Sequence, residues 1–299
     1  MPVEQVARVS GDITGRPRDD EIDLFGITHQ GLVRSENQDQ FLIATIHQEV
    51  VVHGSSLPAT VQLPLRGSRL ATVMLVADGV GGGVGGREAS QLAVETVTRY
   101  ISSTLNSFHA AGSSKEVELL DELRAAALQA HTAVKAEREV RKETKAMATT
   151  LTLGIAVWPW AYVVQVGDSR AYFFQQGKLD MLTRDQTIAQ ALVDKGVLPA
   201  DRAARSPLSH VLASAIGADE ALPEVTRVSI TDRSVLLLCT DGLTKHVTDA
   251  EIAESIKTNS TSEEISRALL ALALERGGTD NVTVIVGQAR GAAGRNRQS

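Results

Sequence analysis

The chain has a single cysteine among its 299 residues, which excludes a disulfide framework and any zinc site built from cysteines. That residue, Cys239, lies in the apolar run 235–239, so a buried structural thiol is expected. No run approaches the roughly 18 apolar residues that a membrane-spanning helix needs. The expectation is a cytoplasmic protein without a membrane partner.

Positive charge is not in excess either. The net charge is -6 at pH 7, the pI is near 5.7, and Lys and Arg are spread along the chain. Because nucleic acids are bound by basic patches, they are not an expected partner. Residues 1–22 are polar and have no signal-peptide core, so a flexible leader is expected there and a flexible tail at 289–299. An apolar content of 43% is enough for a single domain over residues 23–288.

Short strand-like and long helical segments follow one another without an internal repeat. Strands are expected at residues 25–28, 41–44, 73–78, 150–157, 162–168, 171–182, 234–242 and 280–287. Helices are expected at 87–107, 116–144 and 249–275, helix and loop at 187–215, and an irregular excursion at 47–70. The second helix has an apolar face formed by Leu120, Leu123, Ala127, Ala130 and Val134.

The segment 76–90, VADGVGGGVGGREAS, satisfies the dinucleotide pattern G-x-G-x-x-G through Gly81, Gly83 and Gly86. A dinucleotide domain needs a parallel strand after the first helix, and here a second helix follows. A phosphate loop needs Gly-Lys-Ser/Thr, where this chain has Arg87-Glu88. The glycines are therefore expected to serve a tight turn rather than a nucleotide.

Aspartates recur at the ends of the expected strands. Three apolar strands end on Asp78, Asp168 and Asp241, and two begin at Asp39 and Asp280. Turn chemistry alone explains one Asp beside a Gly. Five of them, each beside an apolar strand, indicate carboxylates that converge on one edge of the sheets.

Carboxylates clustered without neutralising lysines repel one another, and a cation relieves that repulsion. A ligand set of oxygens, with no His or Cys close in the motifs, selects Mg²⁺ or Mn²⁺. The carbonyl of Gly79 is a candidate ligand of a second ion beside the one held by Asp78, because glycine lets the backbone approach closely. Two such ions activate a shared water and clamp a phosphoryl oxygen, for which Arg34 is the candidate anchor.

Seven segments, in this order, resemble the motif series of the metal-dependent PP2C-type (PPM) serine/threonine protein phosphatases, in the style of the bacterial branch. They are RSENQDQF, VADGVGGGVGGREAS, MATTLTLGIA, VGDSRAYFF, LTRDQT, LLLCTDGLT and GGTDNVTVIV. The resemblance covers about residues 24–287. It implies an α+β fold, a four-layer α-β-β-α sandwich of two mostly antiparallel sheets flanked by paired helices.

The resemblance implies a metal ligand set. Asp78 resembles the carboxylate that bridges both ions, and Gly79 resembles a residue whose carbonyl binds one of them. Asp241 and Asp280 resemble the ligands of the other ion. Asp168, together with Asp241, matches the position that helps bind a third, weaker ion in bacterial members. The implied cofactors are two Mn²⁺ or Mg²⁺ ions, with this third ion in addition.

Catalytic roles follow from the same resemblance. Asp39 resembles the residue that holds metal-bound water, and Arg34 resembles the phosphate-binding arginine. Gln38 stands where some members have Glu, a water-mediated contact that an amide can also make. Val80 stands where animal members carry a histidine proposed as general acid, so the leaving oxygen must be protonated by other means. An aryl phosphate, whose leaving group needs little protonation, should then be hydrolysed comparatively well.

Other positions carry weaker expectations. Thr149 and Thr150 match a GTT element with Ala148 in place of Gly, and packing is their expected role. Residues 187–218 match the flap of the family, where Arg202 and Arg205 are candidate substrate contacts, although solvated arginines are the ordinary case. The remaining positions with only an ordinary or neutral expectation are His29, His210, His246, Gln186 and Gly83.

The function implied by the resemblance is hydrolysis of phosphoserine and phosphothreonine in proteins, with a serine/threonine kinase as the opposing enzyme and a monomer as the expected state. The alternative is a catalytically silent relative that binds phosphoproteins or scaffolds a signalling complex. Its expected sign, loss of a metal aspartate, is absent from the sequence.

Overall fold

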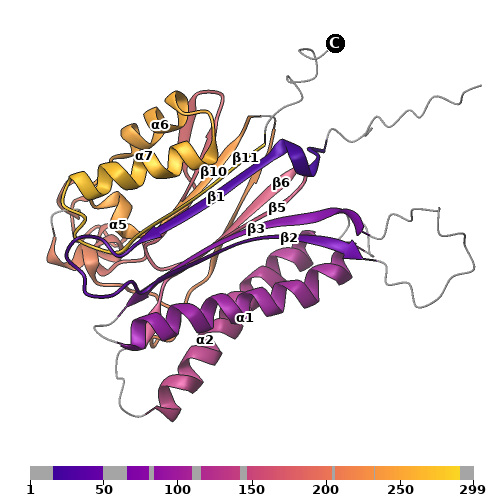
Figure 1. The fold of residues 1–299 in the computed structure, drawn as a ribbon. Coiled ribbons are helices and arrows are strands. Elements are labelled where there is room, and N and C mark those ends of the chain that lie inside the picture. Colours follow the sequence, from indigo (N-terminus) through magenta and orange to yellow (C-terminus); the bar gives the residue numbers. More distant parts are fainter. Residues whose placement is uncertain are drawn as a thin grey trace, which may run out of the picture.

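Two antiparallel β-sheets form the two middle layers of the computed structural model, which describes residues 16–49, 66–80, 84–109, 116–141, 147–203, 206–231 and 233–289 (Figure 1). One sheet has the strand order β1 (Ile22–His29), β11 (Val282–Ala289), β10 (Val235–Cys239), β7 (Arg170–Gln175) and β8 (Lys178–Met181). The other has the order β2 (Asp39–Glu49), β3 (Arg66–Val80), β5 (Leu151–Val157), β6 (Trp160–Val166) and β9 (Glu224–Ser229). A short strand, β4 (Ala148–Thr149), pairs with the end of β3.

Helices cover the outer face of each sheet. The long helices α1 (Val84–His109) and α2 (Glu116–Val140) lie against the sheet that contains β3 (Figure 1). The pair α6 (Asp249–Thr258) and α7 (Ser262–Glu275) lies against the sheet that contains β1 and β11. The four-layer sandwich expected from the sequence is confirmed. Two long helices in succession and wholly antiparallel sheets also exclude a dinucleotide fold.

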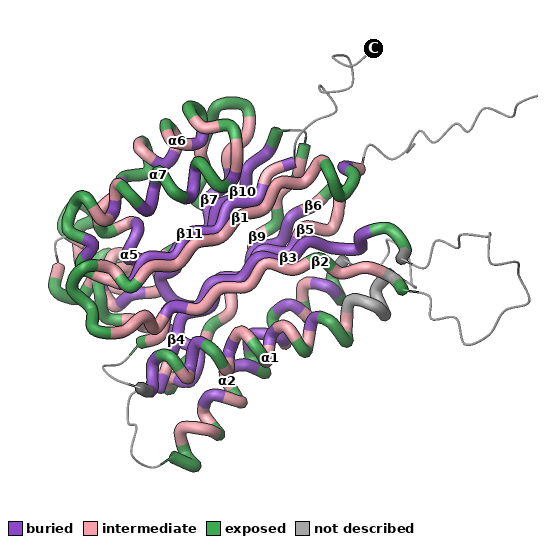
Figure 2. The backbone as a smooth tube through the Cα atoms, viewed as in Figure 1, coloured by how far each residue is buried: buried purple, intermediate pink, exposed green. Residues whose placement is uncertain are grey.

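The apolar residues of the central strands are buried from both sides (Figure 2). Successive side chains of a strand point to opposite faces. In β3, Leu75 therefore packs in the cluster beneath α1 and α2, whereas Met74 and Val76 pack between the two sheets. A third cluster joins α6 and α7 to their sheet, with Leu237 and Ile265 at its centre. Such double burial explains why these strands read as continuous apolar runs.

Several expected boundaries were wrong. Strand β2 continues to Glu49 and β3 begins at Arg66, so residues 47–49 and 66–70 of the irregular excursion expected at 47–70 are strand, and the rest lies outside the described residues. Irregular pairing after Ile46 lets the two strands stay bonded through polar sequence. The helix expected at 249–275 is instead two helices, because Thr261 caps the second one and forms a capping box with Glu264.

Four short helices contribute residues to a groove at one end of the sandwich. Helices α3 (Ile188–Asp194) and α4 (Ala200–Ala203), a 3₁₀ helix at Pro207–His210 and α5 (Asp241–Thr244) lie there. At the start of the described chain, buried Arg69 donates to Asp19 at 2.8 Å and to the Pro17 carbonyl at 2.9 Å, which ties part of the expected leader to β3. Within the described ranges, no helix is both long and apolar enough to cross a membrane.

Candidate metal centre

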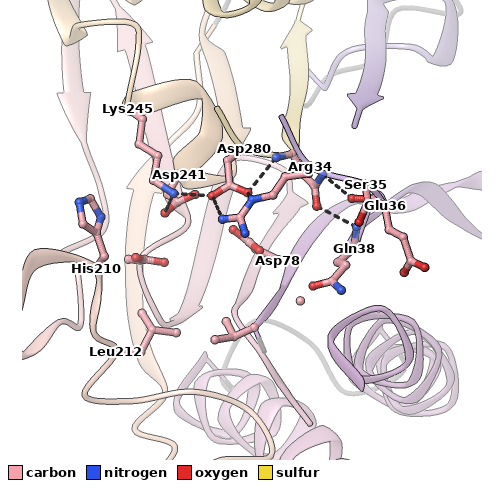
Figure 3. Close-up of a pocket in the computed structure, with 14 residues that line it drawn as sticks. Arg34, Ser35, Glu36, Gln38, Asp78, His210, Leu212, Asp241, Lys245 and Asp280 are labelled. Carbon is pink, nitrogen blue, oxygen red and sulfur yellow. Dashed lines mark hydrogen bonds and ion pairs between the residues drawn. The ribbon is translucent and has the colours of Figure 1, made fainter. Parts of the chain in front are cut away.

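A cavity of about 380 Å³ opens where the strand ends meet (Figure 3). It brings together residues far apart in the sequence. Those that line it are Arg34, Ser35, Glu36, Gln38, Asp78, Gly79, Val80, Asp168, His210, Leu212, Asp241, Lys245, Asp280 and Asn281. Of the site residues expected from the sequence, only Asp39 is not on the cavity wall. It lies buried on β2, directly opposite Asp78 on β3.

The backbone of Asp78 is held by Thr149 of β4 and by Thr150, which lies between β4 and β5. Strand β3 does not end at Asp78, as expected from the sequence, but continues to Val80 because β4 pairs with its last residues. Thr150 Oγ1 accepts from the Asp78 N–H at 2.9 Å, and Thr149 Oγ1 donates to the Asp78 carbonyl at 2.8 Å. These threonines were expected to serve packing. In the structure they also orient Asp78 through hydrogen bonds to its backbone.

Asp39 is almost wholly buried, with 3% of its surface exposed. Its Oδ2 accepts from Thr240 Oγ1 at 2.9 Å and from Thr283 Oγ1 at 2.6 Å. Its Oδ1 has no hydrogen-bond partner in the structure. Burial raises the pKa of Asp39 to about 7, despite the two hydroxyl donors. One oxygen of this carboxylate is fixed and the other is free to accept a hydrogen bond.

Two glycines permit close backbone approaches at the site. A Cβ on Gly79 would lie 2.3 Å from the Gly86 carbonyl oxygen, so the first turn of α1 packs directly on the strand beside Asp78. A Cβ on Gly242 would lie 1.9 Å from the Asn281 carbonyl oxygen. That contact seats α5 against the start of β11 and brings Asp241 beside Asp280. Gly81 and Gly83 of the expected turn lie outside the described residues.

Arg34 reaches Asp280 across 246 positions of sequence. Its Nε lies 2.6 Å from Asp280 Oδ1 and its Nη2 donates to Oδ2 at 2.7 Å, a two-pronged pair. The loop that carries Arg34 is pinned by buried Asn281. The Asn281 amide donates to the carbonyls of Gln30 and Glu36 at 2.8 Å and accepts from the Gln38 N–H at 2.9 Å.

Lysine is present at the site, contrary to the expectation of carboxylates without neutralising lysines. Lys245, at the end of α5, places Nζ 2.6 Å from Asp241 Oδ2 and 2.7 Å from Asp280 Oδ2. Burial acts to lower the pKa of Lys245, but Asp241 and Asp280 outweigh it and raise the pKa above its ordinary value. The sequence signal was available, because residues four apart on a helix share a face and Lys245 is four positions after Asp241.

Positive charge is therefore distributed unevenly. Burial raises the pKa of Asp78 well above its ordinary value, and neighbouring carboxylates raise it further. Burial likewise raises the pKa of Asp168 to about 7. For Asp280, burial also acts to raise the pKa, but Arg34 and Lys245 keep it below its ordinary value. Among the described residues, neither Asp78 nor Asp168 has an ion-pair partner, whereas Asp280 has two.

The donor chemistry fits hard divalent cations. The described residues of the cavity supply carboxylates and the Gly79 carbonyl, and buried oxygens of Asp39 and Asp241 have no hydrogen-bond partner. Buried carboxylates with raised pKa values are stabilised by a cation. Yet no three Asp, Glu, His or Cys side chains of the described chain are arranged to hold one ion as they stand. Asp241 and Asp280 are turned toward Lys245 and Arg34 instead.

The histidines divide between the cavity and its surroundings. His210, for which no functional role was expected, lines the cavity with Leu212 (Figure 3). His29 accepts from the Gly31 N–H, and His246 bonds Thr279, which agrees with the ordinary roles expected for them. Only the fold could place His210, because no spacing in the sequence relates it to the aspartates.

The structure describes Arg202 and Gln186, two residues at or beside the expected flap. Arg202 lies exposed in α4, away from the residues that line the cavity, and Arg205 lies outside the described residues. Gln186 accepts from the Gly167 N–H at 2.9 Å and donates to the Leu222 carbonyl at 2.9 Å. It thereby supports the turn that presents Asp168.

Known proteins share this sequence pattern. The family model described as protein phosphatase 2C matches residues 65–277. The chain is 33% identical over 216 residues to serine/threonine protein phosphatase PstP of Mycobacterium tuberculosis, a match that covers 72% of this chain and 40% of that protein. It is 31% identical over 215 residues to serine/threonine phosphatase stp of Listeria innocua, covering 72% of this chain and 83% of that one.

Solved structures share the fold. The catalytic domain of serine/threonine protein phosphatase PstP in complex with two manganese ions matches with a TM-score of 0.67 at 26% identity, over 90% of this chain and 98% of that one. The match to the Mycobacterium tuberculosis relative spans 40% of its length, so similarity is established for that part only. On the family model and these relatives together, the chain belongs to the protein phosphatase 2C family, in its bacterial branch.

Proposed function

We propose that this chain is a metal-dependent phosphatase that hydrolyses phosphoserine and phosphothreonine in proteins phosphorylated by a serine/threonine kinase. The observation that carries the proposal is the convergence of four aspartates and one arginine on a single cavity, with Asp39 buried behind them. Relatives that bear the phosphatase name and a relative solved with two manganese ions support it.

The residues that would hold the ions are those expected from the sequence. Asp78 would serve both ions, the Gly79 carbonyl one of them, and Asp241 and Asp280 the other, with Asp168 and Asp241 at a third, weaker position. When bound, such ions supply an activated water and stabilise negative charge on the phosphoryl group. Mn²⁺ and Mg²⁺ both suit an oxygen ligand set.

The chain's own groups orient the reactants. Arg34 presents a forked pair of donors at the cavity wall and is the proposed phosphate anchor, shared with Asp280 in the structure. Asp39 is proposed to accept a hydrogen bond from the attacking water through Oδ1, because Oδ2 is already fixed by Thr240 and Thr283. Val80 supplies no proton to the leaving oxygen, although it lines the same cavity.

Replacing Asp241 by Asn tests the function. The change removes one carboxylate charge at constant size, so release of phosphate from a phosphothreonine peptide in the presence of Mn²⁺ is expected to fall by at least about a hundredfold. Asp219→Asn is the matched control, because the Asp219 side chain is 99% exposed. Circular dichroism should show both variants folded.

The outcome separates the two classes of function. Full activity in Asp241→Asn, or activity that persists in EDTA, would overturn the metal-dependent mechanism. If the wild-type protein bound phosphopeptides in Mn²⁺ but released no phosphate, the alternative of a phosphoprotein-binding or scaffolding relative would take its place.

A further inference from the structure

Lys245 occupies the middle of the carboxylate cluster. Figure 3 shows its side chain descending to Asp241 and Asp280, with the Arg34 guanidinium approaching Asp280 from the other side. The Lys245 side chain is 24% exposed, against 18% for Asp241 and 15% for Asp280. This ammonium is therefore an internal ligand of the cavity rather than a solvated surface charge.

The lysine and arginine together take up most of the oxygens on one side of the site. Both oxygens of Asp280 contact Arg34, and its Oδ2 also contacts Lys245. One oxygen of Asp241 contacts Lys245, while the other has no hydrogen-bond partner. A divalent ion held between Asp241 and Asp280 would lie beside the ammonium, whose Nζ is 2.6 Å from Asp241 Oδ2 and 2.7 Å from Asp280 Oδ2. Two cations cannot both be at coordinating distance from these atoms without strong repulsion.

The structure has space for the Lys245 side chain in a second position. A wider groove of about 880 Å³ adjoins the cavity, and Lys245, Thr244 and His210 line it as well. A lysine stem is long and flexible, so its ammonium can leave one position for another. The α5 backbone need not move, because Gly242 holds that helix against Asn281.

We propose that Lys245 competes with the metal ion for Asp241 and Asp280, so that this position binds its ion more weakly than the position at the Gly79 carbonyl does. The inference rests on the proposed two-ion centre and adds a regulation of it. Lys245 balances the charge of the two carboxylates when no ion is bound there, and it sets the concentration of Mn²⁺ at which the second ion enters. The site is then complete only above that threshold.

Calorimetric titration with Mn²⁺ alone tests the competition, because it measures affinity without any activity. The wild-type chain is expected to bind two ions with separate affinities. In Lys245→Gln the weaker one should tighten by about ten- to a hundredfold, while the stronger one changes little. Lys257→Gln is the matched control, since it removes the same charge from an exposed position on α6.

Two further variants keep the test decisive. Lys245→Met retains the apolar stem if the glutamine variant does not fold, and it should show the same tightening. Lys245→Arg retains the charge and should bind the second ion no better than wild type.

The possible failures are distinguishable. If the wild type and Lys245→Gln bound two ions with the same affinities, Lys245 would be a structural ion-pair partner only and the competition would be refuted. If neither the wild type nor any Lys245 variant bound Mn²⁺, the two-ion function itself would fall, and the competition with it.

Discussion

Asn281 acts at the scale of a single residue on the loop that carries Arg34. It is 5% exposed and joins three backbone groups of residues 30–38 through one side chain. Asn281→Ala would leave these groups without a partner, which is expected to cost about 2–4 kcal/mol in the free energy of unfolding. The urea midpoint should fall, and the KM for a phosphopeptide should rise as Arg34 loses its position.

Asn281→Asp separates the accepted hydrogen bond of Asn281 from the two that it donates. The variant keeps the acceptor for the Gln38 N–H but loses the donors to the carbonyls of Gln30 and Glu36. It is expected to be destabilised as well. An alanine variant with unchanged stability and unchanged KM would show that the loop does not depend on Asn281.

The buried carboxylates make metal binding depend on pH. Burial raises the pKa values of Asp39 and Asp168 from 3.8 to about 7, so in the metal-free folded chain both groups hold protons below neutral pH. Because these folded-state values lie above the ordinary one, the stability that the protonated groups contribute is complete below pH 3.8 and is lost as the pH rises through about 7.

Binding of Mn²⁺ should therefore release protons at about pH 6 and almost none at about pH 8.5. Calorimetry in two buffers of different protonation enthalpy counts the released protons at each pH. Asp219→Asn, an exposed change, should leave the count unaltered. Equal release at both values of pH would contradict the raised pKa values.

At the scale of elements, α5 shows how a close approach places a site residue. The Cβ of alanine at Gly242 would lie 1.9 Å from the Asn281 carbonyl, so backbone on one side has to shift. Gly242→Ala is expected to cost about 1–3 kcal/mol in the free energy of unfolding and to weaken Mn²⁺ binding, since α5 carries Asp241. Denaturant unfolding and Mn²⁺ titration measure the two effects.

Gly177→Ala is the control for this prediction. Gly177 has a positive φ, 81°, which Gly242 lacks, and no atom lies within 4 Å of the position of its Cβ. It should lose stability through backbone strain alone and keep its Mn²⁺ affinity. If Gly242→Ala bound Mn²⁺ as tightly as the wild type, the contact of α5 with Asn281 would not be what positions Asp241.

Sequence reasoning succeeded for elements whose pattern is local. The apolar face of α2 recurs at helical spacing, and the described chain buries Leu123, Ala127, Ala130 and Val134 as expected. It failed where pairing decides the boundary. Residues 66–69, which are not apolar, are strand because β2 offers them a partner, and Asp78 is not the last residue of β3 because β4 pairs beyond it.

At the scale of the whole molecule, the sandwich brings the ends of several strands to one cavity (Figure 1). The expected site residues could be named because each lies at or near the end of an apolar strand in a recognisable motif. Their mutual arrangement could not be predicted, since Arg34 and Asp280 are 246 positions apart and are brought together by the pairing of β1 with β11 and by the hydrogen bonds of Asn281. His210, from the flap, lines the same cavity, and no motif in the sequence predicts that position.

The sequence by itself determined the family, the layered fold, the oxygen-rich donor set and the absence of a histidine at position 80, because motifs and alternation are properties of neighbours in the chain. Only the tertiary structure decided which carboxylates have a counter-charge. Lys245 and Arg34 come to Asp280 from separate segments, whereas Asp39 and Asp78 have no such partner within the part of the chain that the structure describes. Charge balance depends on distance and burial, and both arise only when the chain has folded.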